Sequence, residues 1–179
     1  MKQNILTSTL LVMGLLVGCT QAGSTEDKLL GSWNFSVFMS PSKVAEMSKD
    51  PLPPGATMEI TMEGSTTILH GHRYNAEGQA TLRLAMQGKE LPLKFLIRES
   101  GRWEMHDDVF VQITEDGVVT PLDDMTRSIV ADSPEMTALF EPVKGASASS
   151  RILNISHNEM NVVTLEEPKG LRVKYIRTS

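Results

Sequence analysis

The stretch LLGSWNFSVFM (residues 29–39) alternates apolar and polar side chains from Trp33 onward. Successive side chains of an extended chain point to opposite faces, so Trp33, Phe35 and Val37 would share one face. Serine and asparagine occupy the opposite face in the first half of this run. The pattern therefore predicts a strand with one buried face and one face in water.

The same alternation recurs along the chain in short runs that turn-forming residues separate. Gly64 interrupts the second run and predicts a bend of the kind found at barrel corners. Strands do not alternate with helical patterns, which argues against a parallel α/β fold. We therefore predict an all-β, antiparallel fold of about 8–10 strands with one short helix. The predicted strands are 29–39, 57–74, 79–87, 91–98, 102–106, 109–115, 151–156, 160–166 and 171–177. The turns between them are predicted at 75–78, 99–101, 107–108, 116–117, 157–158 and 168–170.

Two longer connections interrupt this series of strands. The first, at 40–56, predicts one helical turn after Ser40, because Pro41 suits the first position of a helix. Connections of this length in compact domains are either functional lids or surface loops, and both readings stay open.

The second connection covers roughly residues 121–150. In it Ser133 is a candidate N-cap for a short helix from Pro134 to about Phe140. The tract GASASS at 145–150 is expected to form a mobile loop, since it is rich in small residues.

Cys19 is the only cysteine of the chain, so it cannot form a disulfide within the chain. It follows a basic start at Lys2 and an apolar run at 10–17. This run is much shorter than the roughly 20 residues that a membrane-spanning helix needs. A basic start and a short apolar run are typical of a secretory signal peptide.

The residues Leu16-Val17-Gly18-Cys19 resemble the lipobox of bacterial lipoproteins. The resemblance implies that the precursor is cut before Cys19 and that Cys19 then carries fatty acyl chains such as palmitate. Two or more chains hold a protein stably at a membrane. Thr20 stands where inner-membrane lipoproteins have Asp, so the implied location is the bacterial cell envelope, at the outer membrane facing the periplasm. An ordinary secretory signal that leaves a free thiol is the alternative.

These patterns divide the chain into a signal peptide (1–18), a lipidated Cys with a flexible tether (19–28) and one β-barrel domain (29–179). About 160 residues remain from Cys19 onward, which is the usual size of one domain. Loss of Lys2 with the signal peptide changes the formal net charge from -5 to about -6. Lys and Arg form no compensating cluster, so we expect no nucleic-acid partner.

Gly31-Ser32-Trp33 resembles the Gly-x-Trp signature of lipocalins and other calycins. The resemblance extends loosely over 29–177 and implies a lipocalin-like (calycin) β-barrel whose closed end is plugged by Trp33. In that family a basic residue of the last strand packs across this Trp. Arg177 shares a strand face with Tyr175, so we expect its guanidinium to stack on Trp33.

A second, shorter resemblance concerns the order SGRWE (100–104), DDVFVQ (107–112), ILNISHNEMNV (152–162) and KYIR (174–177). This order is similar to that of the small periplasmic bile-sensing partners of membrane-bound regulators. It implies a co-receptor for bile salts. Those partners carry a membrane-spanning helix, whereas this chain has a lipobox-like segment.

His70 and His72 are an i, i+2 pair that would lie on one strand face, where two imidazoles can share a metal ion. Zinc or copper would need further ligands, for which His106, His157 or a carboxylate would have to come close. The alternative is a solvated strand end. We expect no metal site and no cofactor.

Three acidic pairs, at 107–108, 123–124 and 166–167, do not predict acid–base catalysis, because neighbouring side chains of a strand point to opposite faces. They suit turns and solvated edges. The chain lacks a Gly-x-Ser-x-Gly sequence and a Gly-rich phosphate loop. We therefore expect that the protein is not an enzyme.

The sequence favours a membrane-anchored binding module for a small apolar or amphipathic ligand, such as a fatty acid, a lipid or a bile-salt-like compound. Small closed barrels can hold one ligand. The dispersed methionines suit either a pliable pocket lining or an ordinary core. The alternative is an accessory, pilotin-like envelope lipoprotein with a protein partner. The expected ligand-binding residues are Phe35, Met58, Ile60, Met62, Leu82, Leu84, Phe95, Trp103, Met105 and Tyr175, with Trp33 and Arg177 as a structural plug.

Overall fold

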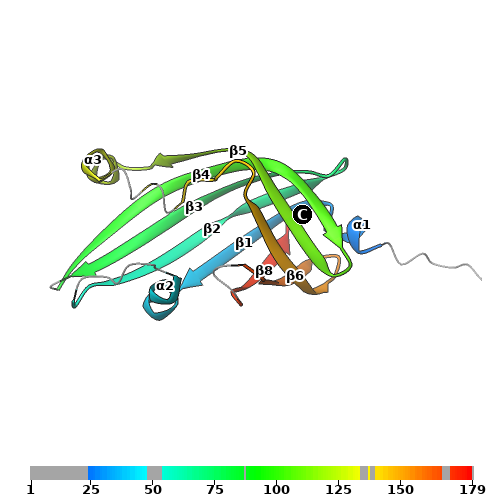
Figure 1. Ribbon diagram of the computed structural model, residues 1–179, viewed down its shortest axis with the longest axis horizontal. Coiled ribbons are helices and arrows are strands. Elements are labelled where there is room, and N and C mark those ends of the chain that lie inside the picture. The colour runs from blue at the N-terminus through cyan, green and yellow to red at the C-terminus, as the bar shows by residue number, and fades with distance from the viewer. Residues whose placement is uncertain are drawn as a thin grey trace, which may run out of the picture.

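Eight strands form one antiparallel sheet that closes on itself in the computed structural model, which describes residues 24–47, 54–86, 88–133, 137, 140–166 and 170–178 (Figure 1). Each strand pairs with the next along the chain, and the last pairs with the first. The strands are β1 (Gly31–Met39), β2 (Thr57–Leu69), β3 (Arg73–Met86), β4 (Lys89–His106), β5 (Val109–Pro121), β6 (Ser147–Ile155), β7 (Glu159–Thr164) and β8 (Arg172–Arg177).

The two ends of the closed sheet differ because the strands differ in length. β2, β3, β4 and β5 have 13 to 18 residues, whereas β6, β7 and β8 have 6 to 9. The long strands extend past the short ones at one end, which we call the open end. Helix α1 (Thr25–Leu29) lies at the opposite, closed end, and α2 (Pro41–Met47) and α3 (Asp124–Asp132) lie at the open end (Figure 1).

The core lies inside the closed sheet and follows the predicted alternation. In β1, Trp33, Val37 and Met39 are buried, whereas Asn34, Ser36 and Phe38 between them are exposed. The apolar face is inside because burial removes it from water. The fully buried large side chains include Trp33, Tyr74, Phe95, Leu82, Leu93 and Met160.

The second hairpin turns at residues 70–72, so the predicted turn at 75–78 is wrong. Residues 75–78 are an inner part of β3, paired with β2 on one side and β4 on the other. Gly78 lies directly opposite Gly64 of β2. Asn, Glu and Gly favour turns locally, but here hydrogen bonds to two neighbouring strands outweigh that preference.

The predicted turns at 99–101 and 116–117 are also wrong, because both segments lie within long strands. Their residues pair with each other, Glu99 with Gly117 and Ser100 with Asp116. A register shift between Ser100 and Gly101 marks a β-bulge, which bends a strand without ending it. The nine predicted strands therefore reduce to eight.

The expectation of a mobile loop at 145–150 is also wrong for most of that tract. Residues 147–150 belong to β6 and pair with residues 110–113 of β5. The small polar side chains of this tract do not by themselves favour a strand. Its backbone is extended because it forms hydrogen bonds with β5. The predicted turn at 157–158 is confirmed between β6 and β7.

The helices are more numerous than the one that was expected. The predicted helical turn after Ser40 is confirmed as α2. α3 was not predicted; Asp123 caps its start, and Ser133, expected as an N-cap, is instead its C-cap. Most of the helix expected at 134–140 lies outside the described residues.

The expected tether is partly helical. Ser24 and Asp27 form a capping box at the start of α1, in which the Ser24 hydroxyl accepts from the Asp27 amide and the Asp27 carboxylate accepts from the Ser24 amide. The predicted signal peptide, the lipobox and Cys19 lie outside the described residues. None of the helices in the described ranges is both long and apolar enough to cross a membrane.

Candidate functional site

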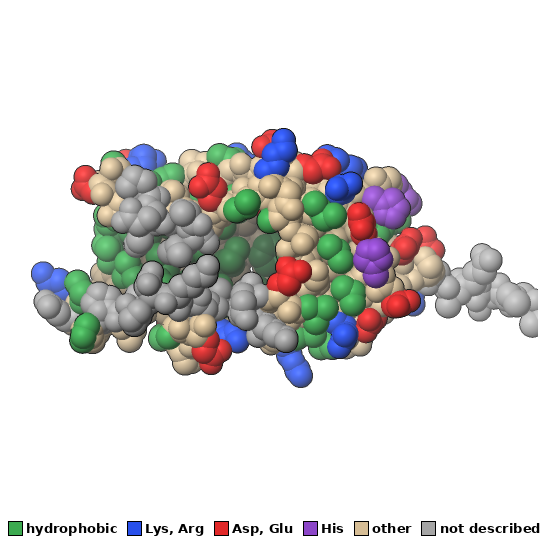
Figure 2. Space-filling model, viewed as in Figure 1, with side chains coloured by type: hydrophobic (Ala, Val, Ile, Leu, Met, Phe, Trp, Pro, Cys, Tyr) green, Lys and Arg blue, Asp and Glu red, His purple; other side chains and the backbone are tan. Residues whose placement is uncertain are grey.

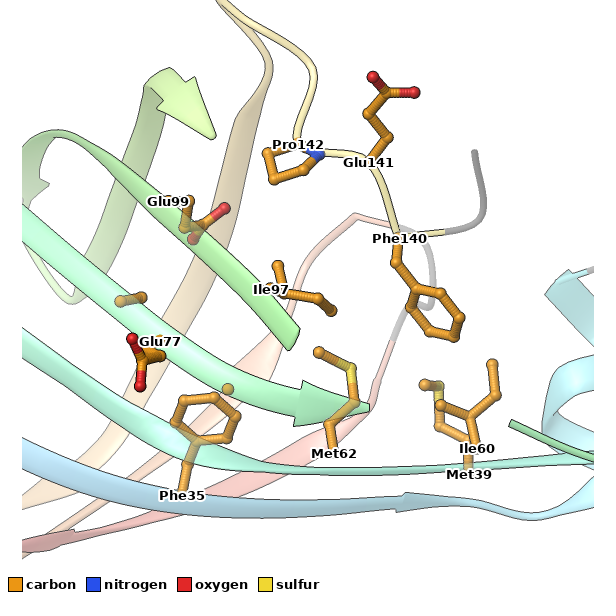
Figure 3. Close-up of a pocket in the computed structure, with 12 residues that line it drawn as sticks. Phe35, Met39, Ile60, Met62, Glu77, Ile97, Glu99, Phe140, Glu141 and Pro142 are labelled. Carbon is orange, nitrogen blue, oxygen red and sulfur yellow. The ribbon is translucent and has the colours of Figure 1, made fainter. Parts of the chain in front are cut away.

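A cavity of about 310 Å³ lies inside the sheet, between the inner faces of β1 to β4 and the segment that enters β6 (Figure 3). This volume is at the lower end of the range for small-molecule sites. The surface is hollowed near its middle, with hydrophobic side chains at the bottom of the hollow (Figure 2). The cavity is lined by Phe35, Met39, Ile60, Met62, Ala76, Glu77, Gly78, Ile97, Glu99, Phe140, Glu141 and Pro142.

Most of the lining is apolar, because it consists of inward-facing positions of neighbouring strands. Met62, Ile97 and Phe140 point toward one another across the cavity (Figure 3). The Phe140 ring also packs against the buried Phe95 ring, with 5.1 Å between ring centroids. This aromatic pair holds residue 140 against the sheet, so the segment 140–142 forms one wall of the cavity.

Gly78 forms part of another wall, and Gly64 of β2 lies directly opposite it. A Cβ on Gly64 would lie 2.3 Å from the Glu77 carbonyl oxygen and 2.5 Å from the Gly78 Cα, so only glycine fits there. The Phe35 ring covers the inner face of this pair, 3.4 Å from where a Gly78 Cβ would stand. The sheet can therefore bend sharply here, and an aromatic ring replaces the missing side chains.

Of the three glutamates that line the cavity, Glu99 is partly buried, whereas the other two are exposed. Burial raises the pKa of Glu99 above its ordinary value of 4.5, and a hydrogen bond with the Tyr74 hydroxyl opposes this rise. The other two acidic lining residues differ. The Glu77 carboxylate accepts from Arg98 Nε at 2.6 Å and is more than half exposed, and the Glu141 carboxylate points away from the cavity (Figure 3).

Two tyrosines accompany Glu99 in the interior. Burial, with the nearby Glu99 charge as a smaller cause, raises the pKa of Tyr175 to about 12. Burial likewise raises the pKa of Tyr74 to about 12, where a hydrogen bond with Thr114 at 3.4 Å acts in the opposite direction. Both hydroxyl groups therefore keep their protons near neutral pH and can donate hydrogen bonds to Glu99 or to a bound polar group.

Three of the expected ligand-binding residues line this cavity: Phe35, Ile60 and Met62. Tyr175 lies beside it, with its ring 5.8 Å from the Phe35 ring. The others face inward as expected but do not line it; Leu82, for example, pairs directly with Ile60 and is packed in the core instead. Met58, Leu82, Phe95 and Trp103 are buried in the core, and Leu84 and Met105 pack against it.

The lining residues that sequence reasoning missed fall into three groups. Met39, Ala76, Gly78 and Ile97 face inward, and alternation alone does not separate them from core residues. Glu99 continues the alternation of Phe95 and Ile97, and a charged residue at an inward position is the signal that could have identified it. The remaining missed residues are Glu77, Phe140, Glu141 and Pro142.

At the closed end, Arg177 lies over Trp33, with its guanidinium carbon 4.1 Å from the ring centroid. It donates to three backbone carbonyls, those of Lys28, Leu30 and His157, each at 2.5 Å. Trp33 Nε1 donates to the Leu29 carbonyl at 2.7 Å. These bonds join α1 and the β6–β7 turn to the seam between β1 and β8.

Gly31 is required for this arrangement. Its φ is +117°, and a Cβ there would lie 2.4 Å from Arg177 Nη1. The first residue of Gly-x-Trp is therefore glycine because the arginine occupies the space of a side chain.

The histidine pair is not on a strand face, which corrects that expectation. His70 and His72 lie in the β2–β3 turn, and His72 has a φ of +60°. The His72 ring packs on Trp103 with centroids 4.6 Å apart. Within the described ranges, His, Cys, Asp and Glu do not gather in any group of three or more suited to a metal ion.

The acidic pairs have structural positions. Residues 107–108 form the β4–β5 turn, as predicted. Asp123 caps α3, and Glu166 accepts a hydrogen bond from the Ser149 hydroxyl at 2.8 Å. Glu167 lies outside the described residues.

No protein-family model and no curated protein matches this chain.

Proposed function

We propose that the protein is a lipid-anchored binding module of lipocalin-like type that holds a small apolar or amphipathic molecule inside its closed sheet. The observation that carries this proposal is the cavity, which combines an apolar lining with one partly buried carboxyl group. Ligand pockets commonly combine an apolar lining with a few polar groups that orient the ligand. Trp33 under Arg177 supports the lipocalin-like assignment.

The proposed anchor at Cys19 sets the orientation of the domain. Arg177 holds the carbonyls of Lys28 and Leu30, so the chain enters the domain at the closed end. The five residues from Thr20 to Ser24 reach at most about 17 Å. The closed end would then face the outer membrane, and the open end would face the periplasm.

The ligand proposal is tested by native mass spectrometry of the full chain after expression in bacteria. A retained small molecule in the amphiphile mass range supports the proposal. Titration with fatty acids, bile salts and alkyl amines follows, with Phe140→Trp as a fluorescent reporter in the cavity wall. Phe38→Trp is the matched control, because Phe38 is 59% exposed on the outer face of β1.

A blocking variant links binding to this cavity. Ala76→Met should fill the cavity and abolish binding without lowering the melting temperature, since the larger side chain enters empty space. Gln79→Met on the same strand, on the exposed outer face, should bind as the wild type does. Unchanged binding in Ala76→Met, or no binding of any amphiphile by the wild type, contradicts the proposal.

The anchor is tested separately by metabolic labelling with palmitate. The wild type should incorporate the label and fractionate with the outer membrane, and Cys19→Ala should lose both properties. A wild-type chain that remains unlabelled and soluble in the periplasm would support the ordinary secretory signal instead.

A second candidate function, a protein-interaction lipoprotein, is favoured by exposed hydrophobic side chains at the open end. These are Phe38, Met86, Leu122 and Met125, each at least 39% exposed. Crosslinking in the intact envelope, from a photoreactive residue at position 38, would capture such a partner. Capture of one envelope protein together with an empty cavity favours this second function over the first.

A further inference from the structure

The charged residues that line the cavity are all acidic. Of the 12 residues that line it, none is Lys, Arg or His, and three are Glu. Fatty acids and bile salts carry anionic head groups, which protein sites usually bind with a basic side chain or with backbone N–H groups. Among the described residues, the lining offers no basic side chain for such a head group.

Glu99 differs from the other carboxylates in its partners. On the outer surface, Glu77 pairs with Arg98, Glu115 with Arg73, and Glu159 with Lys174. Within the part of the chain that the structure describes, no Lys or Arg pairs with Glu99. The groups that face it are the hydroxyl of Tyr74 from β3 and Tyr175 from β8, both neutral near pH 7.

Glu99 is partly buried, and a partly desolvated carboxylate without a counter-ion is unfavourable; a bound cation reduces that penalty. An ammonium group near Glu99 would gain a charge-assisted hydrogen bond. A carboxylate at the same place would add a second negative charge in a partly desolvated site, where like charges repel strongly. A neutral alcohol could donate a hydrogen bond to Glu99 but would gain no attraction between opposite charges.

We propose that the cavity selects amphiphiles with a cationic ammonium head, with Glu99 as the counter-ion and the apolar lining around the alkyl or aryl body. This inference rests on the proposed ligand-binding function. It replaces the anionic amphiphiles among the expected ligands with positively charged ones.

The volume sets the size of suitable probes. A cavity of about 310 Å³ is at the lower end of the range for small-molecule sites, so probes with a short alkyl chain suit it. A saturated chain of ten carbons is a reasonable upper length. Decylamine, decanol and decanoate therefore form a matched series in which only the head group changes.

The experiment is isothermal titration calorimetry at pH 7 on the full chain made by cell-free synthesis, with each probe below its micelle concentration. Decylamine should bind at least tenfold more tightly than decanol, and decanol more tightly than decanoate. Glu99→Gln should weaken decylamine binding at least tenfold and decanol binding much less. Glu104→Gln is the matched control, because it removes the same charge from the outer face of β4.

The outcomes separate the two proposals. Equal or tighter binding of decanol and decanoate overturns the cationic preference and leaves the binding function standing. Failure of all three probes, in a folded protein, overturns the binding function as well.

An independent measurement does not require a variant. In nuclear Overhauser spectra of the wild type with decylamine, the methylene next to the amine should contact the rings of Tyr74 and Tyr175. Contacts of that methylene with Met39 and Phe140 instead would place the head group away from Glu99 and overturn the proposal.

Discussion

Single residues determine how the closed end is built. Arg177 satisfies three carbonyls and covers Trp33, and this is possible only because Gly31 has no side chain. A flexible lysine has no planar fork to bond several carbonyls at once, so arginine is the suitable residue. In this Gly-x-Trp sequence, Gly31 leaves space for the arginine, and Trp33 supplies the aromatic ring that the arginine covers.

Gly31→Ala should lower the free energy of unfolding by about 3 kcal/mol, from backbone strain and from displacement of Arg177. Gly170→Ala is the control, since Gly170 has a φ of +76° with nothing near its Cβ position, so only strain of about 1 kcal/mol is expected. Chemical denaturation measures both. Equal losses in the two variants would contradict a steric role for Arg177.

Glu99 should make stability depend on pH. Burial raises the pKa of Glu99 above 4.5, so the folded state holds this proton more tightly than the unfolded state does. Stability from this group is complete below pH 4.5 and is lost as the pH rises through the folded pKa. Without ligand, the melting temperature of Glu99→Gln minus that of the wild type should therefore increase from pH 4 to pH 8. A constant or decreasing difference in melting scans contradicts this sign.

Among the elements, β4 contributes to the wall of the cavity, and α3 is attached to β4. β4 continues through a bulge at 100–101 where a local reading expects a turn, and so carries both Ile97 and Glu99 to the cavity. α3 is attached to β4 by Thr126, which is fully buried. Its hydroxyl donates to Asp123 Oδ1 at 2.7 Å and accepts from the Lys94 amide at 3.0 Å.

Thr126→Val should cost about 1–3 kcal/mol of stability, because it leaves the Lys94 amide without its partner. Hydrogen exchange at that amide should accelerate. Thr126→Ser keeps the hydroxyl and should retain most of the protection. If Thr126→Val protects the amide as well as Thr126→Ser does, α3 is held to β4 by packing alone.

At the scale of the whole molecule, the pairings that close the sheet differ in length. β2 and β3 pair from Thr57 to Leu69, whereas β1 and β8 pair only from Trp33 to Ser36. Closure removes the open edges that an eight-stranded sheet would otherwise expose. The seam is also where Arg177 adds its three hydrogen bonds.

Native-state hydrogen exchange should reflect this difference. Amides in the centre of β3 should exchange only by global unfolding, and those of β8 should exchange at least about tenfold faster through local opening of the seam. Mass spectrometry of peptides from the two strands measures this ratio. Uniform protection would mean that the sheet opens only as one unit.

Sequence reasoning was most successful where the signal is local. The inward positions of Trp33, Phe35 and Val37 follow from strict alternation, because adjacent side chains in any strand point to opposite faces. The position of Arg177 over Trp33 needed the family resemblance, since nothing in the local pattern relates two residues at opposite ends of the domain.

Sequence reasoning failed where pairing between strands outweighs the local preference for a turn. Residues 75–78 and 99–101 resemble turns, but each lies between two partner strands whose hydrogen bonds keep it extended. The same limit applies to the cavity: Ile60 and Leu82 are equivalent by alternation, yet only Ile60 lines it.

By itself, the sequence determined an antiparallel all-β fold and the side of each strand that faces inward, because a two-residue period is a property of the local chain. Only the tertiary structure decided where the strands turn, how the sheet closes and which inward residues surround a cavity. These features depend on register and on ring closure, which join residues such as Gly64 and Gly78, or Trp33 and Arg177, across long separations in sequence.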